Sequence, residues 1–398
     1  MSMDFEARDT ANAAYVGALG ALRLGAVSSK FILPSAINPA NQSQMIRNGD
    51  FARDTISVGY LVFPNFYVSA TSGGIDTAPG ATRTINASIE YPAGVMHQVT
   101  FGGSATGTMT DGQARMVSDP IAVSIPRGAQ FWINVRQAST AGIIYANSRT
   151  GYPGFGDQEI NSSGLSVVDN TMVPGWTGAA GGATYRPLFV AMTRRPTVAV
   201  IGDSRVEGAA NTSGAVPYPG EVMPGIGPLF GCINLARGGC TIQTAVTGTN
   251  SAKRREYLAY ATHGVMQLGI NDISSARTAA QIRADRASFR AYAPTLTWIE
   301  TTIPPKTTST DSWATVTNQT LDTNNSVRVT LNNLIRGGDA GVAGLFDIAD
   351  AMESSRNSGK WKAPPLVDAA ITADGLHQND AGCALAVPFI PAGVINNR

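Results

Sequence analysis

The sequence predicts two structural parts: a β-sandwich-like or jelly-roll-like N-terminal domain over residues 1–190 and an α/β domain with a parallel sheet over residues 191–398. Two observations predict this division. Short apolar runs broken by Gly, Asn, Ser and Pro fill residues 28–190, which is typical of an all-β sandwich. Further along the chain, apolar strand-like runs alternate with helical patterns, which is typical of a parallel sheet covered by helices on both faces.

The start of the chain is interpreted as a short helix or irregular lead-in over residues 8–24. Its uncharged stretch, residues 10–22, is shorter than the roughly 20 residues that a membrane span needs. Acidic residues outnumber the single arginine ahead of that stretch, whereas a signal peptide begins with net positive charge. We therefore expect no membrane span and find no clear signal peptide. The compartment stays open, and an extracellular or particle-associated location is compatible with the sequence.

Four stretches of the first part have the composition of strands: residues 56–63, 83–91, 121–125 and 130–135. Pro126-Arg127-Gly128-Ala129 separates the last two and predicts a hairpin turn. The glycine-rich residues 148–182 are too long for a simple connection, so they either wall one side of a site or form an exposed linker. Several aromatic side chains either stack on sugar rings or, more commonly, pack in the core: Tyr60, Phe63, Phe66, Tyr67 and Trp132.

The second part predicts five strands and two clear helices from its apolar periodicity. The strands are expected near residues 197–202, 231–236, 264–270, 295–303 and 343–349, and the helices over 276–292 and 379–386. The carboxyl ends of parallel strands are where such sheets bind ligands. Side chains that follow these strands are therefore the candidates for a functional site.

Ser204 is the most informative of these side chains, because Gly202-Asp203-Ser204 follows a buried strand directly. The tripeptide alone is also ordinary turn chemistry, since Gly tolerates positive φ and Asp caps helices. A serine becomes a nucleophile only when a neighbouring base, most often a histidine held by a carboxylate, removes its proton. Among three histidines only His377 has a carboxylate close by in a turn, in Asp374-Gly375-Leu376-His377. His97 has no such partner, and His263 begins a predicted strand, where a structural role is expected.

Acyl transfer also needs hydrogen-bond donors for the oxyanion. A predicted strand ends in Gly238-Gly239, and another ends in Asn271-Asp272. Each segment alone is also an ordinary strand terminus. Asp272 is expected to fix the loop that presents Asn271, and Asp203 is expected to hold the serine turn.

Together these segments resemble the SGNH (GDSL-type) hydrolase family in order and spacing over residues 195–398. The resemblance implies a flavodoxin-like three-layer domain and a serine esterase. It also implies Ser204 as the nucleophile, His377 as the base, Asp374 as its partner, and an oxyanion hole from Ser204, Gly239 and Asn271. Gly239 is preferred over Gly238 by counting from Asn234. The segment Arg205-Val206-Glu207-Gly208 is more charged than is usual for the family. It is expected to alter the pocket and to leave the chemistry unchanged.

Other chemistries are less well supported. No Gly-x-Ser-x-Gly, His-Glu-x-x-His or Cys-x-x-Cys pattern occurs, and with His377 in a triad too few His and Cys remain for a zinc site. We expect neither a metal nor another cofactor. Cys232, Cys240 and Cys383 are expected to be buried free thiols. The net charge of +1 and the scattered basic residues indicate no nucleic-acid partner.

The family resemblance fixes the reaction type without fixing the ester. An accessory β domain and a polar, low-charge composition favour removal of acetyl groups from a carbohydrate or polysaccharide, by association rather than mechanism. Two alternatives stay open. One is a general short-chain carboxylesterase or arylesterase acting on small esters, and the other is a carbohydrate-binding surface or virion protein with incidental hydrolase activity. The oligomeric state is not predicted.

Overall fold

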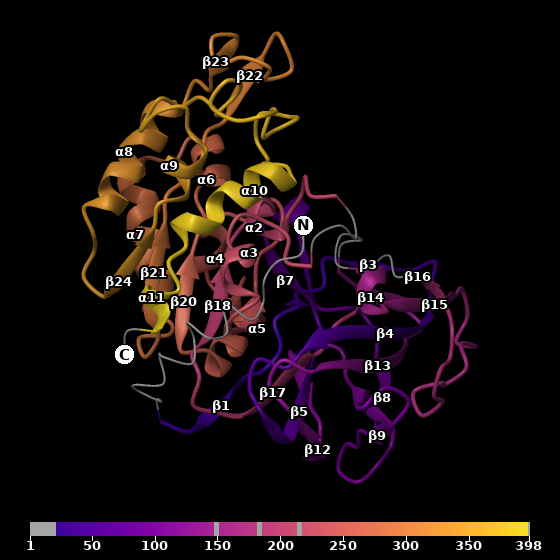
Figure 1. The fold of residues 1–398 in the computed structure, drawn as a ribbon. Helices are drawn as coiled ribbons and strands as arrows, with labels where there is room; N and C mark the ends of the chain where they lie inside the picture. Colours follow the sequence, from indigo (N-terminus) through magenta and orange to yellow (C-terminus); the bar gives the residue numbers. More distant parts are fainter. Residues whose placement is uncertain (1–20, 147–150, 181–184, 213–216, 397–398) are drawn as a thin grey trace.

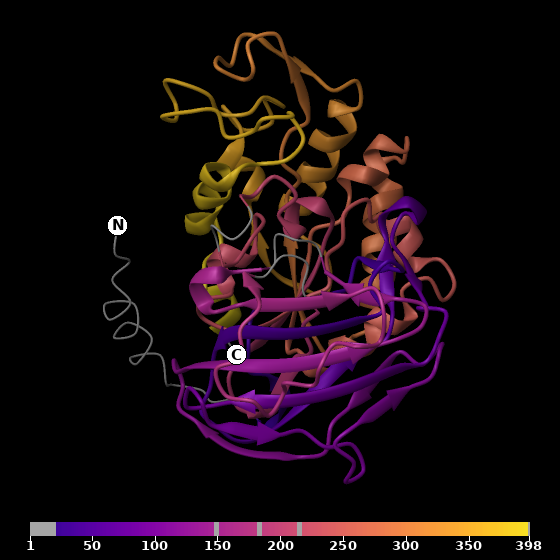
Figure 2. The same cartoon turned by 90° about the vertical axis from the view of Figure 1, so that its right-hand side faces the viewer.

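The computed structural model describes residues 21–146, 151–180, 185–212 and 217–396 (Figure 1). Residues 8–20 of the predicted lead-in lie outside them, and its last two residues, Arg23 and Leu24, are in strand β1 (Arg23–Ala26) rather than in a helix or an irregular segment. Antiparallel strands gather at one end of the molecule, and a parallel sheet with its helices forms the other end (Figure 2). None of the helices in the described ranges is long and apolar enough to cross a membrane.

The second half of the chain is mixed α/β, built on a six-stranded parallel sheet in the order β2-β19-β18-β20-β21-β24. Its strands are β2 (Phe31–Ile32), β18 (Thr197–Ile201), β19 (Gly231–Asn234), β20 (His263–Met266), β21 (Thr297–Thr301) and β24 (Val342–Phe346). The five strands predicted from apolar runs are confirmed. Without β2, their chain order across the sheet is 2-1-3-4-5, the flavodoxin-like order.

Helices cover both faces of this sheet. They are α2 (Ser204–Glu207), α3 (Met223–Ile226), α4 (Ile242–Val246), α5 (Ala252–Arg255), η4 (Glu256–Tyr260), α6 (Ile270–Ser274), α7 (Ala279–Arg290), α8 (Asn325–Arg336), α9 (Ile348–Met352), α10 (Asp380–Ala386), η5 (Val387–Phe389) and α11 (Gly393–Asn396). Successive residues of β18 point to opposite faces: Ala199 and Ile201 join the core with α4, α7 and α8, while Val198 and Val200 join the core with α3, α9 and α10.

Two of these helices are the predicted ones, and local sequence explains their starts. Thr278 accepts from the Gln281 N–H while the Gln281 side chain accepts from the Thr278 N–H, so a capping box begins α7. The Asn379 side chain accepts from the Gly382 N–H and begins α10. Both helices end within a few residues of the prediction.

Two antiparallel sheets occupy most of the first half. The five-stranded sheet has the order β1-β17-β5-β11 with β12 on β5, and the seven-stranded sheet has the order β10-β8-β13-β4-β15-β16 with β9 on β8. Their strands are β1 (Arg23–Ala26), β4 (Ser43–Phe51), β5 (Ile56–Pro64), β8 (Arg83–Glu90), β9 (Met96–Gln98), β10 (Gly107–Met109), β11 (Arg115–Val117), β12 (Ile121–Ile125), β13 (Gln130–Ala138), β15 (Gln158–Ser162), β16 (Ala179–Ala180) and β17 (Leu188–Thr193). Buried side chains of both sheets, among them Phe63 and Val135, form one core.

Smaller pieces complete the structure. Three two-stranded pairs are β3 (Ala36–Asn38) with β14 (Ile143–Tyr145), β6 (Tyr67–Ser69) with β7 (Ile75–Thr77), and β22 (Thr307–Ser309) with β23 (Gln319–Leu321). Short 3₁₀ turns are η1 (Ala70–Ser72) and η3 (Pro153–Phe155).

The predicted hairpin around Pro126–Ala129 is wrong. β12 pairs with β5 in one sheet, whereas β13 pairs with β4 and β8 in the other. The turn residues reverse the chain as predicted, but they do not choose the pairing partner. Each strand pairs where its apolar face meets the common core, so the turn carries the chain from one sheet to the other.

The first half also supplies an edge strand to the parallel sheet. Phe31 and Ile32 of β2 pair in parallel with Ile233 and Asn234 of β19. Phe31 also stacks on Tyr257, with ring centroids 5.3 Å apart. The two halves are thus joined both by strand pairing in the parallel sheet and by side-chain packing.

The glycine-rich segment predicted over residues 148–182 is not a free linker in its described part. β15 pairs with β4 and extends the seven-stranded sheet. The aromatic side chains of the strands mostly serve packing: Phe63 and Phe66 are fully buried. The Trp132 indole is covered by the Arg47 guanidinium at 4.1 Å and donates to the Phe155 carbonyl.

Candidate active site

Ser204 lies at the carboxyl end of β18, where the chain turns into the short helix α2. The Asp203 side chain caps this helix by accepting from the Arg205 N–H at 3.0 Å. The Asp203 N–H in turn donates to Gln267 Oε1, 3.0 Å away. Asp203 is fully buried, and burial raises the pKa of its carboxyl. These contacts match the structural role expected of Asp203 and fix the turn that presents the serine.

His377 and Asp374 meet Ser204 although they are far from it in the chain. Ser204 Oγ lies 2.7 Å from His377 Nε2, and His377 Nδ1 lies 2.7 Å from Asp374 Oδ2. Asp374 Oδ1 also accepts from the His377 backbone N–H at 2.7 Å. The structure therefore brings the three predicted side chains into one hydrogen-bonded line.

Asp374 is placed so that its charged form is favoured. Partial burial raises the pKa of its carboxyl, but the hydrogen bonds from the His377 N–H, the His377 ring and the Leu376 N–H outweigh this effect. The pKa of Asp374 consequently lies below its ordinary value, and the carboxylate is ionised at neutral pH. An ionised carboxylate on Nδ1 favours the tautomer in which Nε2 can accept the Ser204 proton.

The predicted oxyanion donors lie beside the serine. A Cβ built on Gly238 would be 3.6 Å from Ser204 Cβ, so the Gly238-Gly239 turn runs directly past Ser204. Within the described chain, neither the Ser204 N–H nor the Gly239 N–H has a hydrogen-bond acceptor. Asn271 Nδ2 donates to the Cys240 carbonyl at 3.0 Å, which holds its amide next to the same turn.

Asp272 holds the loop that bears Asn271, as expected. Its carboxylate accepts from the Ile242 and Gln243 N–H groups at 2.9 and 3.0 Å, at the start of α4. The loop bearing Asn271 is thereby tied to the helix that follows Gly239. Burial raises the pKa of Asp272 to about 6.

Two positioning residues were missed by sequence reasoning. Arg205 is buried, and its guanidinium donates to the carbonyls of Leu376, Pro304 and Pro305 at 3.0, 2.9 and 2.6 Å. Glu207 Oε2 accepts from the Gly238 N–H at 2.7 Å, and its other oxygen pairs with Arg237. The charged run after Ser204 was their only signal. These side chains tie the loop of Asp374 and His377 and the Gly238-Gly239 turn to α2.

Glu221 is buried close to Arg205 and Asp203, and burial raises the pKa of its carboxyl to about 8. Between its ordinary pKa of 4.5 and about 8, the folded protein holds a proton that the unfolded chain releases. Stability from this group is therefore lost as pH rises through that window, by about 1.4 kcal/mol per pH unit at most.

Glu221→Gln, which mimics the protonated carboxyl, is expected to remove this pH dependence. The variant's free energy of unfolding, relative to the natural protein, should rise by about 1 kcal/mol or more between pH 5 and pH 8. Urea unfolding at the two pH values measures this difference. An identical difference at both would mean that Glu221 does not titrate in this way.

His263 and the cysteine thiols have other surroundings. His263 is buried at the start of β20, with Nδ1 2.7 Å from the Thr262 hydroxyl, as expected of a structural histidine. Cys232, Cys240 and Cys383 are buried and unpaired, as predicted. In the described ranges no cluster of three or more His, Cys, Asp or Glu is arranged to hold a metal ion.

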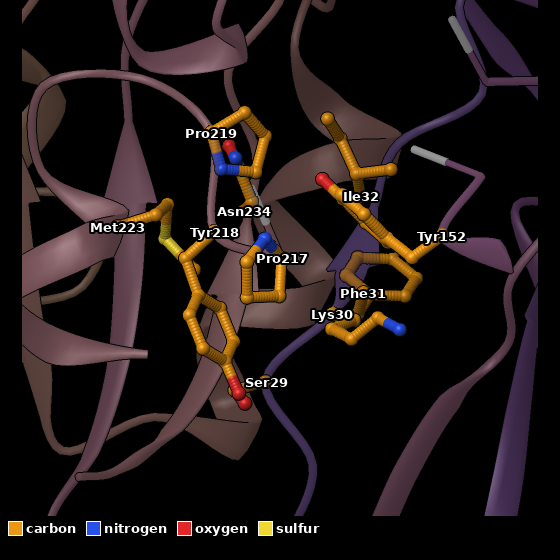
Figure 3. A pocket seen from close by; sticks show the side chains of 10 residues that line it. All are labelled: Ser29, Lys30, Phe31, Ile32, Tyr152, Pro217, Tyr218, Pro219, Met223 and Asn234. Carbon is orange, nitrogen blue, oxygen red and sulfur yellow. The ribbon is translucent and has the colours of Figure 1, made fainter. Parts of the chain in front are cut away.

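A separate pocket opens between the segment before β2 and the loop leading to α3 (Figure 3). Tyr218 and Met223 lie on one side of it, and Ile32 and Tyr152 lie on the other. Lys30 also lines it, and burial lowers the pKa of its amine to about 7. None of the predicted site residues lines this pocket.

No protein-family model matches the chain, and no curated protein matches it in sequence. Solved structures do resemble it. A GDSL-like lipase from Bacteroides thetaiotaomicron is 16% identical, with 51% of this chain and 89% of that chain covered and a TM-score of 0.37. A member of the lipolytic G-D-S-L family from Veillonella parvula is 16% identical, with 51% and 98% covered and a TM-score of 0.34.

An acetyl xylan esterase variant from Geobacillus stearothermophilus is 15% identical, with 50% of this chain and 94% of that chain covered and a TM-score of 0.34. Two of these three similar structures are described as GDSL-like or G-D-S-L proteins.

Proposed function

We propose that this protein is a serine esterase of the SGNH type that removes short acyl groups, acetate above all, from a carbohydrate. The hydrogen-bonded line from Ser204 through His377 to Asp374 carries the proposal, with 2.7 Å at each step between side chains. Residues 191–398 would hold the catalytic groups, and the two antiparallel sheets of residues 1–190 would form an accessory sandwich-like domain.

In the proposed reaction, Ser204 Oγ attacks the ester carbonyl carbon while its proton passes to His377 Nε2. The negative carbonyl oxygen is met by the N–H groups of Ser204 and Gly239 and by the Asn271 amide. His377 then gives the proton to the departing alcohol, leaving an acyl-serine. Water attacks that ester with His377 again as the base, and the acid and free Ser204 are released.

Asn271→Ala is expected to lower kcat for an activated acetate ester by roughly 10² to 10³, the usual cost of losing one oxyanion donor. Asn324→Ala is the matched control. The Asn324 amide donates to the carbonyl of Ile273, 3.3 Å away, and Ile273 lies in α6, the helix that also contains Asn271. The kcat of the control should stay close to that of the natural protein. Equal kcat in both variants would remove Asn271 from the oxyanion hole.

The Gly238-Gly239 turn, here called the oxyanion turn, is covered on one side by the first half of the chain. The Ala70 carbonyl lies only 2.7 Å from where a Cβ on Gly239 would stand, so a second segment closes this side of the turn. The preference for a carbohydrate alcohol is supported only by the extra antiparallel sheets and the low charge of the chain.

The test compares acetate release from an acetylated polysaccharide with hydrolysis of p-nitrophenyl acetate and p-nitrophenyl octanoate. Activity on the first two but not on the octanoate supports the proposal, with Ser204→Ala as the inactive control. Activity on the simple esters alone indicates a general carboxylesterase. No activity on any of the three would overturn the esterase and favour a carbohydrate-binding protein.

A further inference from the structure

The β6–β7 hairpin of the first half, with η1 at its tip, contacts the oxyanion turn of the second half. Backbone hydrogen bonds join the two. The Thr241 N–H donates to the Gly73 carbonyl at 3.1 Å, and the Asp76 N–H donates to the Asn250 carbonyl at 2.8 Å. The hairpin is therefore bonded at the start of α4 and again beyond its end.

Two glycines let the backbones meet. Gly239 has φ +75°, and a Cβ there would lie 2.7 Å from the Ala70 carbonyl oxygen. Opposite it, Gly74 has φ +96°, and a Cβ there would lie 2.3 Å from Cys240 Sγ. Both positions thus combine a left-handed backbone with a close contact, and neither has room for a side chain. The conformation of the oxyanion turn consequently depends on a segment more than 150 residues earlier in the chain.

A buried ion pair locks this contact. Arg254 Nε lies 2.6 Å from Asp76 Oδ1, and the Arg254 backbone N–H donates to Asp76 Oδ2 at 2.8 Å. The same guanidinium donates to the Gly74 carbonyl and lies 3.5 Å from Cys240 Sγ. The two side chains are 2% and 1% exposed. A buried pair adds little net stability over an apolar one, but it specifies one geometry.

The turn is also held from its other side. Glu207 accepts from the Gly238 N–H, while Arg237 pairs with Glu207 and donates to the Val68 carbonyl of β6 at 3.3 Å. The turn is therefore clamped between the nucleophile helix and the hairpin. A small shift of the hairpin would rotate the Gly239 peptide and move its N–H.

We propose that the β6–β7 hairpin is a working part of the active site, with Asp76 and Arg254 as positioning residues that aim the Gly239 N–H at the substrate oxyanion. This inference rests on the proposed esterase function. It gives the first half of the chain a role in the chemical step, in addition to any role in binding a substrate.

The test uses Asp76→Asn, which keeps the shape of the side chain and removes its charge, and Arg254→Lys, which keeps the charge and removes the forked donor. Active sites are first counted by labelling Ser204 with a fluorophosphonate. We expect kcat per labelled site for p-nitrophenyl acetate to fall by about 10- to 100-fold in both variants. KM should hardly change, because the lost interaction forms in the transition state.

Inhibition by phenylboronic acid, which forms a tetrahedral adduct with serine, should weaken by a similar factor. The matched control is Glu256→Gln, which breaks another ion pair between the two halves, Arg115 to Glu256 at 2.9 Å. It should leave kcat per site within about twofold of the natural protein.

Unchanged kcat per site in Asp76→Asn or in Arg254→Lys would overturn the proposal, and either variant suffices if the other does not fold. A fall shared by Glu256→Gln would also overturn it, because general contact between the halves would then explain the loss. If the natural protein neither hydrolyses the ester nor reacts with the fluorophosphonate, the esterase function itself fails.

Discussion

Ser204→Ala is expected to lower kcat/KM for p-nitrophenyl acetate by roughly 10⁴ to 10⁶, and His377→Ala by a similar factor. Without the hydroxyl no acyl-enzyme can form, and without the imidazole nothing accepts the Ser204 proton across their 2.7 Å contact. The double variant should be no slower than either single one, because the two side chains act as one unit.

Initial rates of the three variants and the natural protein, at equal concentrations of folded protein, provide the measurement. Residual activity from the oxyanion hole alone is compatible with the mechanism. Additive losses in the double variant would instead mean that Ser204 and His377 act independently, and the proposed triad would be wrong.

Gly375→Ala has the second-largest expected effect. Gly375 has φ +70°, and a Cβ there would lie 2.0 Å from the Thr307 carbonyl oxygen and 2.5 Å from the Trp313 ring. Its own carbonyl accepts from the Thr307 N–H and the Trp361 indole at 2.9 and 3.0 Å. The added methyl must therefore displace the loop that carries Asp374 and His377.

We expect Gly375→Ala to destabilise the protein by about 3 kcal/mol or more and to lower kcat by about 10² through misplacement of the imidazole. Gly338→Ala is the matched control: it has a similar φ of +80° but nothing within 4 Å of its Cβ position. The control should lose only about 1 kcal/mol, the cost of the left-handed backbone. Urea unfolding and ester hydrolysis compare them, and equal effects would contradict the crowding argument.

The sequence was most informative where local pattern alone determines structure. The apolar run of β18 and the apolar periodicity of α7 and α10 need no distant partner, and the positions of these elements are confirmed. Pairing was harder to predict. β12 and β13 are adjacent in the chain yet lie in different sheets, because their partners are selected by a core that forms only when the sheets meet.

The candidate site shows the same contrast. Ser204, Asp374 and His377 could be predicted because each stands in a turn with a recognisable composition, and the structure brings them together. Arg205 and Asp76 could not. Their partners are the backbone carbonyls of Pro304, Pro305 and Leu376 and the side chain of Arg254, and no local motif announces such long-range contacts.

Strand β2 has a consequence for engineering and for biogenesis. Since Phe31 and Ile32 form the edge of the parallel sheet beside β19, a cut near residue 190 would not release an independent hydrolase cassette. It would expose the backbone N–H and C=O groups of β19 as an unpaired edge strand, and such an edge promotes aggregation. During synthesis the ribosome makes β2 about 200 residues before β19, its neighbour in the sheet. This edge of the parallel sheet can therefore form only after more than half of the chain has been made. Expression and redesign of either half should therefore keep the two halves together.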